Sequence, residues 1–311
     1  MSVHVIEVAG LVKDYGKVRA LDGVDLEVRE GEVFGFIGPN GAGKSTTIRV
    51  LLDLLRPTSG AVRVLGEDPR AGGPRLRARL GYLPGELNLE GTATARQLLE
   101  HLAQVRGGRG ADRIAPLAER FRLDLDKPVR TLSKGNKQKV GVLQALMHRP
   151  ELALLDEPTS GLDPLLQQEF LTLVREERDA GTSVFLSSHV LSEIEGVADR
   201  VALVRDGRIA VVDDVAALRA AAGQRLDVTF GSDVPLASLD RVFSAVEGLR
   251  IDGLRARGVW RGEPGPLIAA LHGLPVARLE LRDRDLEELV IDAYRADATT
   301  RPVTPEREQQ P

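Results

Sequence analysis

The sequence predicts an α/β protein with a mostly parallel core sheet, an antiparallel β subdomain, a helical subdomain and a small C-terminal α+β domain. Three short apolar runs support the core sheet: residues 33–37, 152–156 and 183–187. Each run has the length and composition of a buried strand. Helical spacing of apolar side chains lies between the runs, and alternating strands and helices are typical of a parallel sheet covered by helices.

Two further regions complete the predicted N-terminal domain, residues 3–221. Residues 3–8 and 24–28 alternate apolar and polar side chains on either side of a turn at 14–17, which favours a pair of strands. Residues from about 89 to 149 have little strand character and carry apolar side chains at helical spacing. We therefore expect a helical subdomain inserted into the α/β domain.

The pattern changes after residue 222, where shorter elements follow one another in the order β-α-β-β-α-β before a last helix. This order is that of a ferredoxin-like unit, so residues 222–296 are expected to form an accessory α+β domain. The predicted strands are 226–230, 249–255, 257–261 and 276–282, and the predicted helices are 237–246, 265–272 and 284–294. Residues 297–311 are polar and contain prolines, so we expect a disordered tail.

Composition narrows the classes of function. The 311 residues include no cysteine, which excludes disulfides and thiolate metal sites and fits a reducing compartment. The first residues, MSVHVIEVAG, lack a secretory signal, and no apolar run approaches the roughly 18 residues of a membrane-spanning helix. The net charge is −4 with both signs mixed along the chain, so nucleic acid is not expected as a partner. We expect a soluble protein unless a partner holds it at a membrane.

A glycine-rich segment, GPNGAGKST, joins the first apolar run to a helical pattern. A turn of this kind directs backbone N–H groups at phosphate oxygens, and the helix N-terminus adds its positive dipole end. In the pattern GxxxxGK[ST], the lysine reaches the terminal phosphates and the next hydroxyl binds magnesium. We therefore predict a site for the phosphates of a nucleotide, with Ser45 on the Mg²⁺ that accompanies them. The predicted nucleotide-binding residues are Gly38, Pro39, Asn40, Gly41, Ala42, Gly43, Lys44, Ser45 and Thr46.

Two adjacent carboxylates, Asp156 and Glu157, end the second apolar run. Sheets of this class place ligand-facing side chains at that end of a strand. Asp156 is predicted to hold magnesium, directly or through water, and Glu157 to orient and deprotonate the water that attacks the γ-phosphate. Taken alone, the pair could also be a structural acidic turn before Pro158.

Five segments in a fixed order resemble the ATP-binding cassette (ABC) transporter ATPases, and the resemblance extends over residues 5–212. The segments are the phosphate loop, LSKGNKQKV from residue 132, LALLDEP from residue 152, SGLD at 160–163, and His189 after a strand. The resemblance implies that Lys44, Glu157 and His189 act in catalysis, with His189 on the γ-phosphate and the attacking water. It also implies that Tyr15 stacks on adenine, although a packed core tyrosine is the alternative.

The segment LSKGN is the family's signature, and Ser133 suits the N-cap of a predicted helix at 134–147. The resemblance implies that Ser133, Gly135 and Asn136 contact the ATP that the phosphate loop of a second chain binds. Each chain would then supply two half-sites and complete neither.

Three positions depart from the commonest family pattern. Lys134 replaces a glycine and Asn136 a glutamine of the signature LSGGQ, and Gly85 stands where the family has a glutamine that touches magnesium and the membrane partner. Glycine cannot supply that side chain, and Glu86 is the nearest residue that could substitute. The glycine at position 85 therefore puts the magnesium contact and the coupling at its own loop in doubt.

The resemblance implies an ATP-hydrolysing subunit of an ABC transporter, most similar to those of bacterial drug-efflux and export systems. Such a subunit couples dimer closure and hydrolysis to substrate movement through separate multi-span permease subunits, at the cytoplasmic face of the cell membrane. Its second cassette would be a second copy or a homologous chain. The alternatives are a soluble ABC-type ATPase that acts as a switch on a macromolecular partner, and a nucleotide sensor that does not need Glu157. Dimer support, regulation, permease contact and a stabilising appendage remain open for the C-terminal domain.

Overall fold

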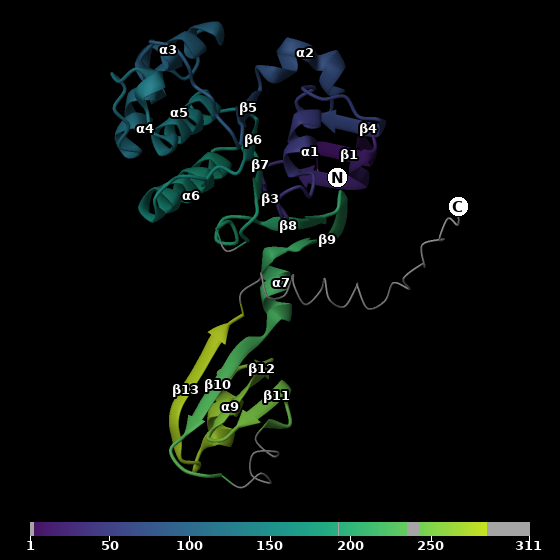
Figure 1. The fold of residues 1–311 in the computed structure, drawn as a ribbon, viewed down its shortest axis with the longest axis vertical. Helices are drawn as coiled ribbons and strands as arrows, with labels where there is room; N and C mark the ends of the chain where they lie inside the picture. Colours follow the sequence, from purple (N-terminus) through teal and green to yellow (C-terminus); the bar gives the residue numbers. More distant parts are fainter. Residues whose placement is uncertain (1–2, 192, 235–242, 285–311) are drawn as a thin grey trace, which may run out of the picture. The chain divides into compact units, whose positions relative to one another are not determined.

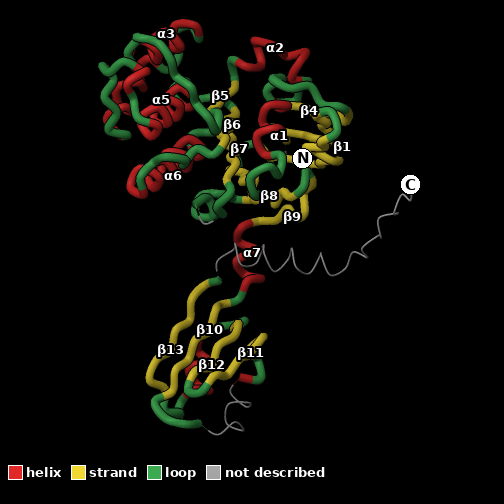
Figure 2. Tube along the Cα trace, in the orientation of Figure 1, coloured by secondary structure: helices red, strands yellow, loops and turns green. Residues whose placement is uncertain are grey.

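The computed structural model describes residues 3–191, 193–234 and 243–284. They form two compact units that divide between Val215 and Ala216, within helix α7 (Val215–Ala222). Figures 1 and 2 trace both units. The division lies a few residues before the predicted boundary at 221/222. Among the described residues, no helix combines the length and the apolar character that a membrane span needs.

A six-stranded sheet forms the centre of the first unit, in the order β5-β6-β7-β3-β8-β9. Neighbours are parallel from β5 to β8, and only β9 runs antiparallel. The predicted mostly parallel core is therefore confirmed. The strands are β3 (Val33–Ile37), β5 (Leu80–Leu83), β6 (Leu152–Asp156), β7 (Ser183–Ser188), β8 (Arg200–Arg205) and β9 (Arg208–Asp214).

A second, antiparallel sheet has the order β2-β1-β4, with β1 (His4–Tyr15), β2 (Val18–Arg29) and β4 (Ser59–Val64). Its first two strands are longer than predicted and meet at the turn that follows Tyr15. The pairing of β1 with β2 shifts register beside Gly10, whose φ is 56°. This shift breaks the alternation of apolar and polar residues, which is why the pattern revealed only part of each strand.

Helices fill the segments between the strands of the first unit. They are α1 (Lys44–Leu51), α2 (Pro69–Arg77), α3 (Ala95–Val105), α4 (Ile114–Arg120), α5 (Lys134–Leu146) and α6 (Pro164–Asp179), with short 3₁₀ turns at Ala111–Arg113 and Val129–Thr131. The segment predicted to be helical, 89–149, contains α3, α4 and α5, which gather in one group apart from α1 (Figure 1). Arg113 forms an ion pair with the buried Glu177 of α6 and donates to Leu146 O at 2.9 Å, which ties this group to the core.

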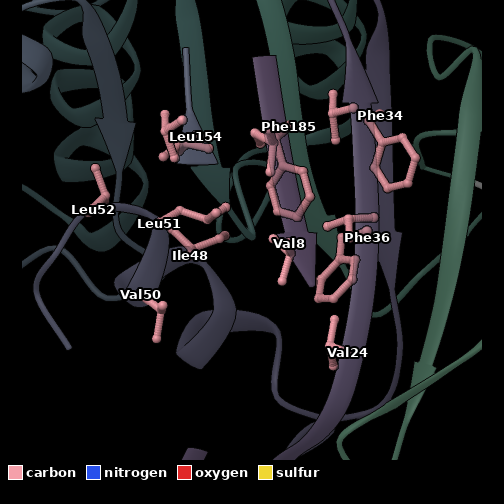
Figure 3. Close-up of a cluster of buried hydrophobic side chains, with 14 of the residues drawn as sticks. Val8, Val24, Phe34, Phe36, Ile48, Val50, Leu51, Leu52, Leu154 and Phe185 are labelled. Atoms are coloured by element: carbon pink, nitrogen blue, oxygen red, sulfur yellow. The ribbon is translucent and has the colours of Figure 1, made fainter. Parts of the chain in front are cut away.

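The apolar core lies between the two sheets and holds β3 in place (Figure 3). The ring of Phe185 on β7 lies 5.9 Å from that of Phe34 and 5.2 Å from that of Phe36, centroid to centroid. Ile48 and Leu51 bury the inner face of α1 in the same cluster. Because strand and helix are both anchored, the loop that joins them has fixed ends.

The second unit contains a four-stranded antiparallel sheet in the order β11-β12-β10-β13. Its elements are β10 (Gln224–Phe230), β11 (Val246–Asp252), β12 (Arg255–Trp260), α9 (Pro264–Leu271) and β13 (Val276–Asp283), each within a few residues of its predicted place. Most of predicted helix 237–246, nearly all of helix 284–294 and the tail 297–311 lie outside the described residues. The ferredoxin-like assignment therefore stays a prediction.

The stability of the first unit should depend on pH because of His148. This residue follows α5 in the sequence, its side chain is buried, and its Nε2 forms a hydrogen bond with Leu80 O at 3.1 Å. Burial, aided by the charge of Arg106, lowers the pKa of His148 from 6.5 to about 4. The folded protein thus binds this proton less well than the unfolded chain. We expect the free energy of unfolding to be highest above pH 6.5 and to decrease by up to about 3 kcal/mol as the pH falls to 4.

Urea unfolding of the wild type and of His148→Gln across this pH range checks the prediction. The variant removes the titrating group but keeps a donor for Leu80 O, so its stability should fall less steeply. Equal pH slopes for the two proteins would show that His148 is not the cause.

Candidate active site

The glycine-rich loop 38–43 leaves β3 and leads directly into α1. A Cβ atom on Gly38 would stand 2.2 Å from Val204 O, and one on Gly43 would stand 2.6 Å from a methyl group of Leu21. Gly43, the N-cap of α1, also has a φ of 108°, which favours glycine. Among the described residues, no side chain forms a hydrogen bond that caps α1. Its N-terminus is therefore held close to the sheet and can receive an anion.

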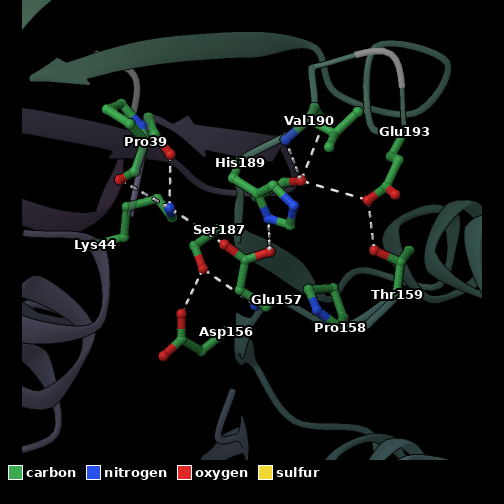
Figure 4. A network of polar contacts seen from close by, with 12 residues as sticks. Pro39, Lys44, Asp156, Glu157, Pro158, Thr159, Ser187, His189, Val190 and Glu193 are labelled. Carbon is green, nitrogen blue, oxygen red and sulfur yellow. Dashed lines mark hydrogen bonds and ion pairs between the residues drawn. The ribbon is translucent and has the colours of Figure 1, made fainter. Parts of the chain in front are cut away.

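Lys44, the first residue of α1, is only 5% exposed. Its Nζ donates to Gly38 O at 2.6 Å and to Pro39 O at 3.4 Å, and forms an ion pair with Glu157 Oε1 at 3.2 Å (Figure 4). The ammonium thus lies against the loop in which the phosphates are expected, and Glu157 neutralises it.

Glu157 lies between the other two predicted catalytic residues, Lys44 and His189. Its Oε1 faces Lys44, while Oε2 is 2.7 Å from His189 Nδ1. The φ of Glu157 is 47°, an uncommon value for a residue with a side chain. Its N–H donates to Ser187 O at 3.2 Å and to Ser187 Oγ at 3.1 Å, which holds this conformation. The structure therefore brings Lys44, Glu157 and His189 together.

Asp156 ends β6 and is 2% exposed. Its Oδ1 accepts a hydrogen bond from Ser187 Oγ at 2.5 Å. A Cβ atom on Gly85 would stand 3.3 Å from Asp156 Oδ2. The position that lacks the family's glutamine thus lies directly beside the predicted metal-binding carboxylate.

The other predicted residues of the loop differ in exposure. Pro39, Asn40 and Gly41 are exposed, Ala42 is buried, and Ser45 and Thr46 are half-buried. No group of three His, Cys, Asp or Glu side chains within the described residues could hold a metal ion. A site made of one hydroxyl and one carboxylate suits Mg²⁺, which takes its other ligands from water and phosphate. The residues present fit that ion.

The signature residues lie at the start of α5, which spans Lys134–Leu146, close to the predicted helix. Ser133 is the N-cap and accepts from the Asn136 N–H at 3.3 Å. A Cβ atom on Gly135 would stand 2.6 Å from Gly161 O, so the signature packs against the SGLD turn. In the described part of the chain, no hydrogen bond or ion pair joins the signature to the phosphate loop, and α5 lies apart from α1 (Figure 1).

Tyr15 is 45% exposed at the end of β1, which contradicts the alternative of a packed core tyrosine. Lys13 Nζ lies 5.2 Å from the centroid of its ring. The ring is therefore available for stacking.

The sequence analysis did not predict two residues of the site, Ser187 and Gln138. Ser187 contacts both Asp156 and Glu157, and its hydroxyl at the end of a buried apolar strand, two residues before His189, was an available signal. Gln138 of α5 donates to Pro158 O at 3.0 Å and to Glu157 O at 3.3 Å. Its position inside a helix gave no such signal, because the contact depends on how α5 packs.

A parallel sheet whose glycine-rich loop holds a buried lysine beside an Asp–Glu pair defines a nucleotide-hydrolysing protein. The profile of the ABC transporter family matches residues 21–160. Over 301 residues the chain is 34% identical to the daunorubicin/doxorubicin resistance ATP-binding protein DrrA of Streptomyces peucetius, an alignment that covers 93% of this chain and 90% of that protein. The chain therefore belongs to the ATP-binding proteins of ABC transporters, and, like members of that family, it is an ATPase linked to transport.

Two further comparisons agree with this membership. The chain is 36% identical over 208 residues to the bacitracin transport ATP-binding protein BcrA of Bacillus licheniformis, covering 66% of this chain and 68% of that protein. A solved structure of the ATP binding subunit of an ABC transporter superposes with a TM-score of 0.65 at 32% identity, covering 69% of this chain and 92% of the other. The cassette fold and the resemblance to the ABC transporter ATPases are thus both confirmed.

Proposed function

We propose that this chain is the ATP-hydrolysing subunit of an exporter whose membrane-spanning permease is formed by separate chains. The observation that carries the proposal is the convergence of Lys44, Glu157 and His189 at the phosphate loop. The named roles of DrrA in drug resistance and of BcrA in bacitracin transport support export as the direction.

The contacts of the site residues support a separate role for each side chain in ATP binding or hydrolysis. Lys44 moves its ammonium from Glu157 to the terminal phosphates when ATP binds, because phosphate oxygens offer more negative charge than one carboxylate. Glu157 is then free to accept a proton from the attacking water, and His189 holds the other carboxylate oxygen. Tyr15 stacks on the adenine. Ser45 and Asp156 would hold Mg²⁺, which neutralises phosphate charge when it is bound.

The complete site requires a second cassette, either another copy of this chain or a homologous ATPase chain. Ser133, Gly135 and Asn136 lie at the N-terminus of α5, whose dipole favours an anion, yet they do not contact the phosphate loop of their own chain. ATP held between the loop of one chain and the signature of the other would close the dimer. Hydrolysis and phosphate loss would reopen it.

An apolar groove beside Gly85 is a suitable place for the permease. Its volume is about 380 Å³, and one of its leucines, Leu54, is 57% exposed. Exposed apolar surface of this kind is common at protein contacts. The lining includes Leu54, Tyr82, Leu87, Leu89, Leu98 and Leu102. A cytoplasmic segment of the permease bound here would hold the chain at the cytoplasmic face of the membrane.

Mixing two inactive variants tests the shared site. Lys44→Ala damages the phosphate loop, and Ser133→Glu places a negative charge where the signature would meet phosphate. Each variant alone should be inactive. An equimolar mixture should recover about a quarter of the wild-type turnover, because half of the dimers are mixed and each of these has one intact site.

Phosphate release measures this recovery, and melting temperatures confirm that each variant is folded. The matched control mixes Lys44→Ala with the double variant Lys44→Ala/Ser133→Glu, in which no dimer contains an intact site. Failure of the first mixture to exceed the control would contradict pairing between two copies of this chain.

A further inference from the structure

Ser187 is a fully buried residue near the end of β7, and its hydroxyl contacts both carboxylate residues of the site. The hydroxyl donates to Asp156 Oδ1 at 2.5 Å and accepts from the Glu157 N–H at 3.1 Å (Figure 4). A serine hydroxyl has one hydrogen to donate. The backbone N–H of Glu157 can only donate, so the hydroxyl hydrogen must point to Asp156, and both contacts have a defined direction.

These contacts act on two features that the site needs. The first is the left-handed backbone of Glu157, which a residue with a side chain adopts only when its surroundings hold it. Ser187 holds it through both its carbonyl and its hydroxyl. The second is the orientation of the Asp156 carboxylate. Within the described residues, its side chain receives a hydrogen bond only from Ser187.

Gly85 makes the second contact more important. A side chain at this position would begin 3.3 Å from Asp156 Oδ2, but glycine has none and adds no donor. A buried carboxylate with a single donor is more dependent on that donor than one with several.

We propose that Ser187 is a positioning residue that sets the direction of the Asp156 carboxylate and holds the backbone of Glu157, and that this role matters more here because Gly85 offers Asp156 no side chain. The inference rests on the proposed function, since it requires both carboxylates to act on ATP. Ser187 is fully buried and acts through the two residues that it contacts. Its loss should therefore lower the rate of hydrolysis more than the affinity for ATP.

The sharpest test compares Ser187→Val with Ser187→Thr, because valine and threonine have nearly the same shape and differ by one hydroxyl. We expect Ser187→Val to lower kcat roughly ten- to hundredfold, the effect of one hydrogen bond to a charged group, with KM for ATP changed much less. Ser187→Thr should keep most of the turnover. Ser187→Ala, which fits without crowding, should lose as much as Ser187→Val.

A second measurement does not depend on turnover. Binding of a fluorescent ATP analogue, titrated with Mg²⁺, should require a higher Mg²⁺ concentration for Ser187→Val than for Ser187→Thr, because only valine leaves Asp156 without its donor. Equal Mg²⁺ dependence and equal kcat for these two variants would overturn the inference.

Ser183→Ala is the matched control. Ser183 is also buried on β7, at its other end, and its Oγ accepts from the Gly31 N–H at 2.9 Å, away from the site. The control should retain wild-type kcat, and a loss equal to that of Ser187→Ala would show a general effect on the strand.

Glu157→Gln separates the two proposals. If that variant is inactive while Ser187→Val is normal, only the present inference fails. If Glu157→Gln hydrolyses ATP normally, the proposed role of Glu157 as the base fails.

Discussion

Glu157→Gln should lower ATP turnover by at least about a hundredfold, the usual contribution of a general base, while ATP still binds. The amide cannot accept the proton of the attacking water. It can still accept a hydrogen bond from Lys44 or His189, so the site should keep its arrangement. Phosphate release and equilibrium nucleotide binding, measured on the same preparation, check both parts of the expectation.

The same variant should move from monomer to dimer in size-exclusion chromatography when ATP is present, because the nucleotide that closes the dimer is no longer cleaved. Glu193→Gln is a suitable control. Glu193 accepts from Thr159 Oγ1 at 2.6 Å in the adjacent network but contacts neither Lys44 nor His189 (Figure 4). Unchanged turnover in Glu157→Gln would exclude Glu157 as the base, and a persistent monomer would contradict the shared site.

Lys44→Ala should weaken ATP binding by roughly ten- to hundredfold or more and abolish measurable turnover, since it removes a buried cation whose charge-assisted bonds are each worth about 1.5 to 3 kcal/mol. In the free protein, Glu157 and Gly38 O also lose their shared partner. Calorimetric titration with ATP gives the affinity, and the melting temperature shows whether the loop still folds.

Lys127→Ala provides the comparison for Lys44→Ala. It removes the same charge from an exposed ion pair with Asp124 in the helical subdomain, where a pair of this kind contributes little. Its affinity for ATP should equal that of the wild type. Normal binding and turnover in Lys44→Ala would mean that residues 38–46 do not form the phosphate site.

Strands were predicted correctly where consecutive residues along the chain carried the pattern. The runs 33–37 and 152–156 correspond to β3 and β6 because every residue in them is buried, which produces an uninterrupted apolar stretch. The first two strands were predicted too short because a register shift beside Gly10 interrupts their alternation. Helix α5 was placed within one residue because Ser133 is an N-cap that the sequence displays directly.

The sequence by itself determined the chemistry of the site, because glycines, a lysine and adjacent carboxylates at fixed spacing suffice for phosphate binding and proton transfer. Only the tertiary structure decided that Lys44, Glu157 and His189 meet. They follow β3, β6 and β7, which are neighbours in the sheet although they are far apart along the chain. Strand order depends on how whole elements pack, so no local pattern encodes it. The same packing decided the role of Ser187, whose hydroxyl reaches the Asp156 carboxylate and the backbone N–H of Glu157 because β6 and β7 pair in this register.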